Sequence, residues 1–424
     1  MASTEIKSHR MDKRQWSWVL YDVGNSAFVM LSTAIAPIYY GSLLTEGSSV
    51  VVGWGYAETI VSLIVALMMP ILGSLADFKN MKKRFFLGAA GTGVVACTAL
   101  SIATSSYTFL IIYIIAAIGL NTSEVFYDAF LVDATDDEDN YDALSSKGFA
   151  WGYIGSLVPF MICVALIFGA KYIGLTTVIA TRISFVITAL WWAGFTIPLL
   201  RNVHQKHFKE RVGHVITQTF TGLGQTIKTI FGDRRLLFFM LAFFCYIDGV
   251  HTIIKMATSF GTDLGIDSTQ LVLALVVTQL VAFPAALIYG KLSRSIQARV
   301  MLIFSAGAYA LITLYAAFFL QSAREFWILA IAVGLFQGGI QALSRSYFGR
   351  LIPDKSRANE YYGFFDIFGK YAAILGTFLM ATFTALTGNA NLGILSITLL
   401  FILGIVFLAI MPKDPQRNSN KPQE

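Results

Sequence analysis

The sequence predicts an all-α integral membrane protein, a bundle of twelve transmembrane helices in two halves of six. Three observations lead to this fold. Hydrophobic residues make up 56% of the 424-residue chain and charged residues only 13%, whereas a soluble protein carries roughly 25% charged residues. Apolar runs of about 20 residues, the length that spans a bilayer as a helix, recur along the chain. One long polar stretch, residues 201–235, separates the sixth run from the seventh.

The apolar runs are continuous, which indicates helices rather than the short alternating strands of a membrane barrel. In the first half, spans are expected at 16–41, 50–75, 85–104, 107–132, 148–169 and 178–200. In the second half, spans are expected at 236–262, 270–292, 300–320, 326–349, 360–384 and 391–411. The division predicts four regions: an N-terminal half over 1–200, a linker over 201–235, a C-terminal half over 236–412 and a tail over 413–424.

Lysine and arginine predict the orientation, because basic residues gather in cytoplasmic loops. Basic clusters precede the first span, follow the second span at 79–84, and recur at 201–235 and 291–299. The loops on the opposite side hold little beyond Lys171 and Arg324. Both termini are therefore expected in the cytoplasm, with the plasma membrane as the expected membrane. The net charge of +6 follows from this bias, and we expect no nucleic-acid partner.

The two halves resemble each other at an offset of 217 residues. Gly-Ser-Leu closes the second span and Gly-Lys-Leu closes the eighth at this offset. The same offset pairs Asp128 with Arg345, and it pairs Asp133 with Arg350. Duplicated halves of parallel topology are the plan of a secondary transporter, whose substrate site lies at the interface between the halves near the middle of the membrane.

Ionisable side chains inside spans are costly, and they mark substrate or ion pathways. Asp22 and Asn25 share one face of the first span. Asp22 is expected to face a water-filled cavity, and the alternative is a buried bond to a neighbouring helix. In the fourth span, Glu124 and Asp128 lie four residues apart. They repel each other, so one of them is expected to bind a proton readily. The remaining candidates for substrate or proton binding are Asn121, Asp248, His251, Lys255, Gln337 and Gln341.

The change of sign between the halves predicts a cytoplasmic gate. Asp128 and Asp133 would meet the two arginines that the offset pairs with them, where the fourth and tenth spans approach each other. Such a pair, desolvated by closure, would lock the outward-facing state, since a stranded partner is costly. The alternative is that Asp133 pairs within its own half, with Lys83 or Arg84. The remaining gate candidates are Asp77, beside that basic cluster, and Asp366 and Lys370, which are expected to pair with each other.

Several function classes are excluded by missing motifs. No Gly-rich phosphate loop of Walker type is present, so ATP does not drive the protein directly. The acidic run at 133–142 lacks the glycine and the terminal glutamate of a calcium-binding loop. No Ser/His/Asp or Cys/His set lies on neighbouring elements. We therefore expect no enzyme, no cofactor and no metal site.

The loop after the second span, GSLADFKNMKKRFF, resembles the helix 2–3 signature of the major facilitator superfamily. It departs from that signature at Phe78, where an arginine is usual, and at Asn80, where a glycine is usual. Three further stretches resemble one branch, the vacuole-effluxer-like (autophagy-related permease) transporters. They are WSWVLYDVGNSAF, FYDAFLVDAT with KGFAWGYIGS, and GGIQALSRSYFGRLIP with EYYGFFDIFGKYAAILG. The resemblance covers residues 14–412.

This resemblance implies a major-facilitator-type bundle with alternating access, in which helices 1, 4, 7 and 10 line the cavity. It also implies export of a small solute, which is an amino acid for the characterised vacuolar member. We therefore expect a proton-linked exporter that acts as a monomer in the lipid bilayer. Two alternatives stay open. One is an exporter of amphiphiles such as lipids or bile salts, for which the Phe-rich eleventh span leaves room, and the other is a non-transporting membrane receptor or scaffold.

Overall fold

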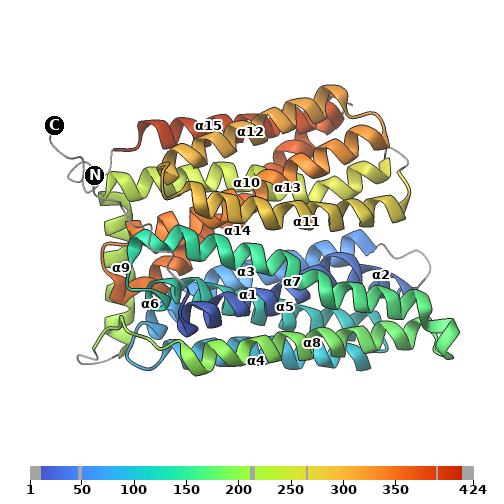
Figure 1. The fold of residues 1–424 in the computed structure, drawn as a ribbon, viewed down its shortest axis with the longest axis horizontal. Coiled ribbons are helices and arrows are strands. Elements are labelled where there is room, and N and C mark those ends of the chain that lie inside the picture. Colours follow the sequence, from blue (N-terminus) through green and yellow to red (C-terminus); the bar gives the residue numbers. More distant parts are fainter. Residues whose placement is uncertain (1–10, 46–49, 211–214, 264–265, 388–389, 413–424) are drawn as a thin grey trace, which may run out of the picture.

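The computed structural model describes residues 11–45, 50–210, 215–263, 266–387 and 390–412, and every named element in these ranges is a helix. Figure 1 shows long helices running side by side along the longest axis of the molecule. Eleven helices of the described part are long and apolar enough to cross a membrane. The helix α14 (Ala358–Thr387), which contains ionisable residues, completes a set of twelve. The predicted twelve-helix bundle is therefore confirmed.

The first half is built from a broken first helix and five continuous ones. Asp12 begins the chain's first helix with a capping box, because its carboxylate accepts a hydrogen bond from the Gln15 amide and the Gln15 side chain accepts one from the Asp12 amide. That helix ends just before Pro37, which stands in the first turn of the next helix, where a proline is tolerated. The elements are α1 (Lys13–Ala34), α2 (Ala36–Ser42), α3 (Val50–Ala76), α4 (Lys82–Ala99), α5 (Ser106–Ala129), α6 (Leu131–Ala134), α7 (Tyr141–Gly169) and α8 (Thr177–Asn202).

The linker contains a helix of its own, α9 (Val215–Gly232), which runs across one end of the long helices (Figure 1). This end is called the α9 end below. Residues of α9 pack against α3, α14 and α10 (Arg234–Asp263). Before α9, the Lys209 amide donates a 2.7 Å hydrogen bond to the Asp77 carbonyl, so the linker is attached to the loop that follows α3. The polar linker thus forms an ordered layer over the α9 end.

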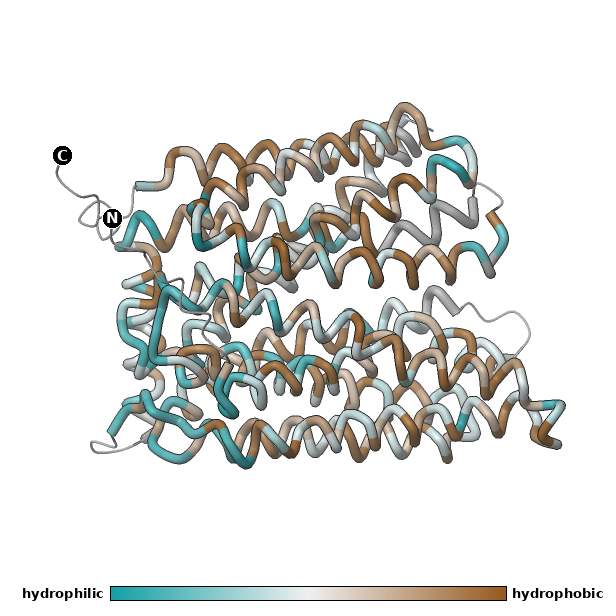
Figure 2. The backbone as a smooth tube through the Cα atoms, viewed as in Figure 1, coloured by the Kyte–Doolittle hydropathy of each residue, from teal (hydrophilic) through white to brown (hydrophobic). Residues whose placement is uncertain are grey.

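The second half contains six continuous helices. Besides α10 and α14 they are α11 (Ser268–Leu292), α12 (Ala298–Phe319), α13 (Ala323–Leu351) and α15 (Ala390–Ile410). The two halves meet where α7 packs on α11 and α13, and where α14 packs on α3 and α5. Figure 2 shows hydrophilic positions gathered at the α9 end and mostly hydrophobic lengths of helix between the two ends. This pattern is expected of helices that face lipid along their length.

The fifth predicted span, 148–169, begins later than the helix that contains it, because α7 begins at Tyr141. The first two turns of α7 contain polar residues, which do not register as an apolar run. These turns are nevertheless buried, because Asp142 and Ser145 contact α13 of the other half. Helix formation here is therefore decided by packing between the halves rather than by hydrophobicity.

Candidate functional site

The centre of the candidate site is Arg345, on α13 of the second half. Its guanidinium is only 4% exposed and lies between two carboxylates of the first half. Nη1 lies 3.0 Å from Oδ1 of Asp128 on α5, and Nη2 lies 3.5 Å from Oδ2 of Asp22 on α1. The contact between Asp128 and Arg345, predicted from the 217-residue offset, is therefore present. Asp22 also accepts a 2.9 Å hydrogen bond from the Tyr127 hydroxyl. Asp22 is therefore buried and bonded to neighbouring helices, which was the alternative to the expected water-filled cavity.

Aromatic rings enclose the same guanidinium. Its Cζ lies 4.3 Å from the centroid of Phe149, 4.7 Å from Trp18 and 5.3 Å from Tyr127. Cations bind to ring faces at such distances, and more strongly where water is excluded. Nε donates to the Ser145 hydroxyl at 2.9 Å, and Nη2 donates to the Ser145 carbonyl at 3.1 Å. The charged, polar and aromatic partners of this guanidinium described above thus all come from the first half.

Gly148 makes this close approach between the halves possible. A Cβ atom at this position would lie 2.8 Å from Oδ2 of Asp22, 2.9 Å from Nη2 of Arg345 and 3.1 Å from the Trp18 ring. Such contacts are too short for a carbon atom, so a larger residue would displace the charged groups. The glycine belongs to KGFAWGYIGS, one of the stretches that carries the family resemblance.

The face of α13 that contains Arg345 continues toward the middle of the bundle with two of the predicted glutamines. Gln337, Gln341 and Arg345 are spaced four residues apart, so they share one helix face. Gln341 accepts a 3.2 Å hydrogen bond from the Tyr153 hydroxyl of α7, and Gln337 contacts the same tyrosine. Both glutamines therefore lie at the interface between the halves.

The other predicted residues of the first half lie close to the charged centre but have partners of their own. Asn25 is buried and donates to the Glu124 carboxylate at 3.4 Å. Asn121 donates to the Ala117 carbonyl of its own helix at 2.7 Å. Glu124 and Asp128 therefore bind different partners, Asn25 and Arg345 respectively. A proton shared between the two carboxylates stays a prediction.

In the second half, Asp248 is fully buried on α10. Its Oδ1 accepts hydrogen bonds from the Gly376 amide at 2.9 Å and from the Thr252 hydroxyl at 3.3 Å. These bonds attach α10 to α14. His251 lies one turn further along α10 and is half-buried. The third predicted residue of this helix, Lys255, has a side chain that lies outside the described residues.

At the α9 end, Arg350 pairs with Asp142 rather than with the predicted Asp133. The Arg350 Nη1 lies 2.7 Å from the Asp142 carboxylate, which also accepts a 2.5 Å hydrogen bond from Ser346. The prediction from the offset was wrong here. Asp133 belongs to the short helix α6 (Leu131–Ala134), which follows α5 and directs the Asp133 side chain into its own half. The start of α7 supplies the partner instead. A charge pair between the halves is present, but its acid comes from a different helix.

Asp133 is bound within its own half by Lys82. Their atoms Oδ2 and Nζ are 2.6 Å apart, and both side chains are 0% exposed. The linker adds amide hydrogen bonds from Lys206 at 2.9 Å and His207 at 3.1 Å. Burial alone would raise the pKa of Asp133, but Lys82 and the bonds from His207 hold it below the ordinary value.

The pairing of Asp133 with Lys83 or Arg84 is therefore wrong by one or two residues. Lys83 donates to the Leu200 carbonyl at 2.7 Å, and Arg84 is exposed. Lys82, the first residue of α4, is the one that points inward. Three adjacent basic residues on a helix face in three directions, and the sequence does not fix which one is buried.

Asp77, the acid of the signature loop, connects the two halves at the α9 end. Its carboxylate accepts hydrogen bonds from the Asn359 amide at 2.9 Å, the Asn359 side chain at 2.7 Å and the Glu360 amide at 3.1 Å. These amides belong to the first turn of α14, where a carboxylate is favourable. Lys209 lies 3.8 Å away. Burial raises the pKa of Asp77 to about 7.

The departures from the loop signature have different explanations. Asn80 has a φ of 64°, in the left-handed region that asparagine tolerates better than other residues with a Cβ. It therefore replaces the usual glycine without a change of backbone. Phe78 is buried, and it pairs with Lys209 of the linker in an isolated β-bridge. A side chain that packs under the linker thus stands where an arginine is usual.

Asp366 lies on α14 near the charged centre, where its charge acts on Asp128. The predicted pairing with Lys370 stays untested, because the side chain of Lys370 lies outside the described residues. Sequence reasoning missed several partners whose own signals were weak. Lys82 was hidden among neighbouring basic residues, and Asp142 and Ser145 preceded the expected start of their helix. The aromatic residues around Arg345 looked like ordinary apolar positions of a span.

Comparisons with known proteins agree with this geometry. The sequence model of the family described as "Vacuole effluxer Atg22 like" matches residues 48–421. The MFS-type transporter YxiO of Bacillus subtilis (strain 168) is 43% identical over 423 residues, which cover 98% of each chain. Autophagy-related protein 22-2 of Penicillium rubens is 24% identical over 306 residues, which cover 65% of this chain and 50% of that protein.

Solved structures show the same fold. The MFS transporter FucP, crystallised in the outward conformation, matches with a TM-score of 0.73 at 13% identity, covering 94% of this chain and 98% of that one. The MFS proton:xylose symporter XylE matches with a TM-score of 0.72 at 10% identity, covering 94% of each chain. Together, the family match, the close relative and the fold identify the chain as a member of the Atg22-like vacuole effluxer family, and hence as a transporter of the major facilitator superfamily.

Proposed function

We propose that this transporter exports a small solute by alternating access, driven by the movement of protons, with amino acids as the first substrate class to test. The observation that carries the proposal is the buried cluster of Asp22, Asp128 and Arg345. Its members come from both halves, so the contacts form when the halves meet at this depth and break when they separate. Only about 1.4 kcal/mol changes the ratio of two conformations tenfold, and a buried pair exceeds that when one partner is lost.

The proton linkage is supported by the carboxylates of the first half. Asp22, Asp128 and Glu124 lie within one region of α1 and α5, and a single guanidinium, that of Arg345, contacts the first two. Acidic groups at this depth are costly unless paired, protonated or hydrated. When Arg345 withdraws, a proton can replace it as the neutralising charge. This exchange couples proton binding to the position of the halves.

The α9 end is proposed to face the cytoplasm, with both termini on that side of the plasma membrane. This assignment rests on the concentration of lysine and arginine in the loops of that end. Single cysteines in a variant lacking the three native ones test it. Tyr172→Cys, at the opposite end, should react with an impermeant thiol reagent added to intact cells, and Asp139→Cys should not. Reaction of Asp139→Cys from outside would reverse the orientation.

Transport is tested in proteoliposomes containing the purified protein. The vesicles are loaded with an unlabelled amino acid, and counterflow is measured as the uptake of the same amino acid, labelled, from outside. The uptake is measured first without and then with a pH gradient. The proposal predicts counterflow of at least one substrate and uphill accumulation with the gradient. Glu124→Gln should lose the effect of the gradient while keeping part of the exchange. If exchange in the wild type does not depend on the gradient, the protein is a facilitator without proton coupling. Absence of counterflow for every solute would favour a receptor or scaffold.

A further inference from the structure

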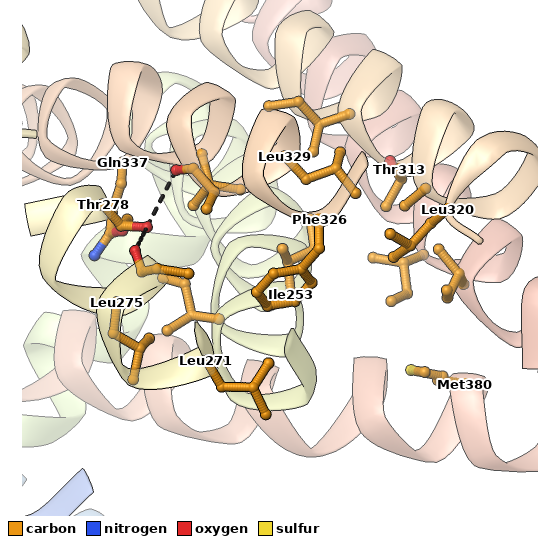
Figure 3. Close-up of a pocket in the computed structure, with 18 of the residues that line it drawn as sticks. Ile253, Leu271, Leu275, Thr278, Thr313, Leu320, Phe326, Leu329, Gln337 and Met380 are labelled. Atoms are coloured by element: carbon orange, nitrogen blue, oxygen red, sulfur yellow. Dashed lines mark hydrogen bonds between the residues drawn. The ribbon is translucent and has the colours of Figure 1, made fainter. Parts of the chain in front are cut away.

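The second half contains an apolar cavity away from the α9 end. Figure 3 shows most of the residues that line it, and its volume is about 130 Å³. Phe326, in the first turn of α13, lines it, and so does Leu320 just before that helix. The cavity therefore lies near the end of the bundle opposite α9. All six helices after the linker contribute to it: Ile253 (α10), Leu271 (α11), Ile312 (α12), Phe326 (α13), Met380 (α14) and Ile394 (α15).

Among the residues that the structure describes, the lining is almost entirely apolar and includes no charged side chain. Only four of the nineteen lining residues are polar, so the cavity offers a water molecule few partners and is expected to stay dry. The Thr278 hydroxyl already donates to the carbonyls of Ala274 and Ala330, at 2.9 and 3.1 Å. The Thr313 hydroxyl likewise donates to the Tyr309 carbonyl at 2.7 Å. The other two polar residues are Gln279 and Gln337, and Figure 3 shows Gln337 beside Thr278 at one end of the cavity.

These glutamines connect the cavity to the interface between the halves. Gln279 contacts Met30 of α1 across that interface, with 3.8 Å between Nε2 and Sδ. Gln337 begins the face of α13 that continues through Gln341 to Arg345. At 1.5 Å per residue, Phe326 lies about 16 Å from Gln337 on one side, and Arg345 lies about 12 Å from it on the other. One helix face thus leads from an apolar cavity, past two amides, to the charged centre.

We propose that this cavity is a subsite for the hydrocarbon group of the transported solute, and that Gln337 and Gln279 bind an uncharged polar group next to it. The volume of the cavity determines which class of hydrocarbon group can bind. A dry cavity of roughly 150 Å³ lined by aliphatic and aromatic residues holds a benzene molecule, so a branched aliphatic or single aromatic group fits here. The identity of the occupant as a solute rests on the proposed transport function, whereas the binding of such a group does not.

The subsite belongs to one half of the protein, which has a consequence for the transport cycle. All its walls come from α10 to α15, so the cavity keeps its shape when the two halves move as rigid bodies. The hydrocarbon group would stay with the second half throughout the cycle, while contacts to the first half form and break. A lipid acyl chain offers the same chemistry, but it would not use the amides at the end facing the interface.

The test uses carboxamides as probes, because an amide can pair with the glutamine side chains while the attached group varies in size. The full chain in detergent is heated with acetamide, isovaleramide, benzamide or biphenyl-4-carboxamide, and the shift of the melting temperature reports binding. The proposal predicts that the shift rises from acetamide to isovaleramide and benzamide and falls for the biphenyl compound. A shift that keeps rising with the biphenyl compound would indicate partition into detergent and would overturn the subsite.

Two variants localise the binding. Ala330→Trp fills the cavity and should abolish the benzamide shift, whereas Ile331→Trp, at the neighbouring exposed position of α13, should keep it. If Ala330→Trp does not fold, the smaller change Ala274→Leu should weaken the same shift. Equal shifts in filled and control variants would contradict the proposal. Lipid that copurifies with the wild type, is absent from the filled variant and is released by benzamide would make the occupant a lipid.

The transport assay separates this inference from the proposed function. The solute that shows counterflow should carry an apolar group, and its transport should be weakened by Ala330→Trp but not by Ile331→Trp. Unchanged transport in both variants would contradict the subsite while supporting the proposed transport function. If benzamide binding depends on Ala330 but the protein shows no counterflow, the binding site is supported and its role in binding a transported solute is contradicted.

Discussion

At the scale of single residues, two buried charged groups in the described part of the chain, those of Arg345 and Asp133, each have several partners. Arg345 is bound by two carboxylates, a serine and three aromatic rings, and Asp133 is bound by an ammonium group and two linker amides. A buried pair contributes little net stability compared with an apolar pair, but removal of one partner strands the other. Single substitutions at these positions are therefore expected to cost more than the interactions they remove.

Asp133→Asn gives the sharpest prediction at this scale. The substitution keeps the shape of the side chain but leaves the Lys82 ammonium buried without a counterion, which costs about 3–5 kcal/mol. We expect a large fall in the melting temperature of the purified protein. Asp136→Asn is the matched control, because its carboxylate pairs with Lys206 and Arg14 while exposed to solvent, and such a surface pair contributes at most about 1 kcal/mol. Equal melting temperatures of the two variants would show that the buried pair does not stabilise the first half.

At the scale of helices, the first turn of α14 and the loop after α3 form a contact that responds to pH. In the closed arrangement, burial raises the pKa of Asp77 to about 7. When the halves separate at the α9 end and water reaches the carboxylate, its pKa returns toward the ordinary value of about 3.9. The closed form therefore binds the proton more tightly. Protonation of Asp77 therefore contributes fully to closure below about pH 3.9, where both forms bind the proton, and this contribution is lost as the pH rises through about 7.

Spin labels at Asp139→Cys and Gln297→Cys measure this effect. Both positions are exposed loop residues at the α9 end, one in each half, and the three native cysteines are removed from the background. The label-to-label distance distribution should contain more of the long distances at pH 8 than at pH 6. Asp77→Asn, which cannot ionise, should show the same distribution at both values. A pH effect of equal size in that variant would assign the titration to another group.

Individual helices also show how far the sequence could predict the site. The offset between the halves located Asp128 opposite Arg345, because duplication preserves the depth of a residue in the bundle. It failed for Arg350, because the short turn after α5 changes the direction of Asp133 and has no counterpart in the offset. The choice of Lys82 over Lys83 depends on the rotation of α4 about its axis, and packing rather than hydrophobicity fixes that rotation.

At the scale of the whole molecule, the two halves carry opposite charges toward each other. The first half supplies Asp22, Asp128 and Asp142, and the second supplies Arg345 and Arg350. The apolar runs predicted the twelve helices well, because bilayer thickness fixes helix length. A simple exchange of Asp128 and Arg345 is not expected to restore the contact. An aspartate at position 345 would face Asp22 and the negative faces of three aromatic rings.

Neutralisation of Arg345 therefore tests the central claim, that this residue holds the halves together at the α9 end. The measurement is the distance between the labels at positions 139 and 297, in wild type, in Arg345→Gln and in Arg299→Gln. Arg299 is the control because it lies at the same end and, within the described part of the chain, donates to the Ala409 carbonyl of its own half. Arg345→Gln leaves two carboxylates without a counterion, so the population with long distances should increase at least about tenfold, for a loss of about 1.4 kcal/mol or more. Arg299→Gln should match the wild type. An unchanged distance distribution in Arg345→Gln would contradict the account.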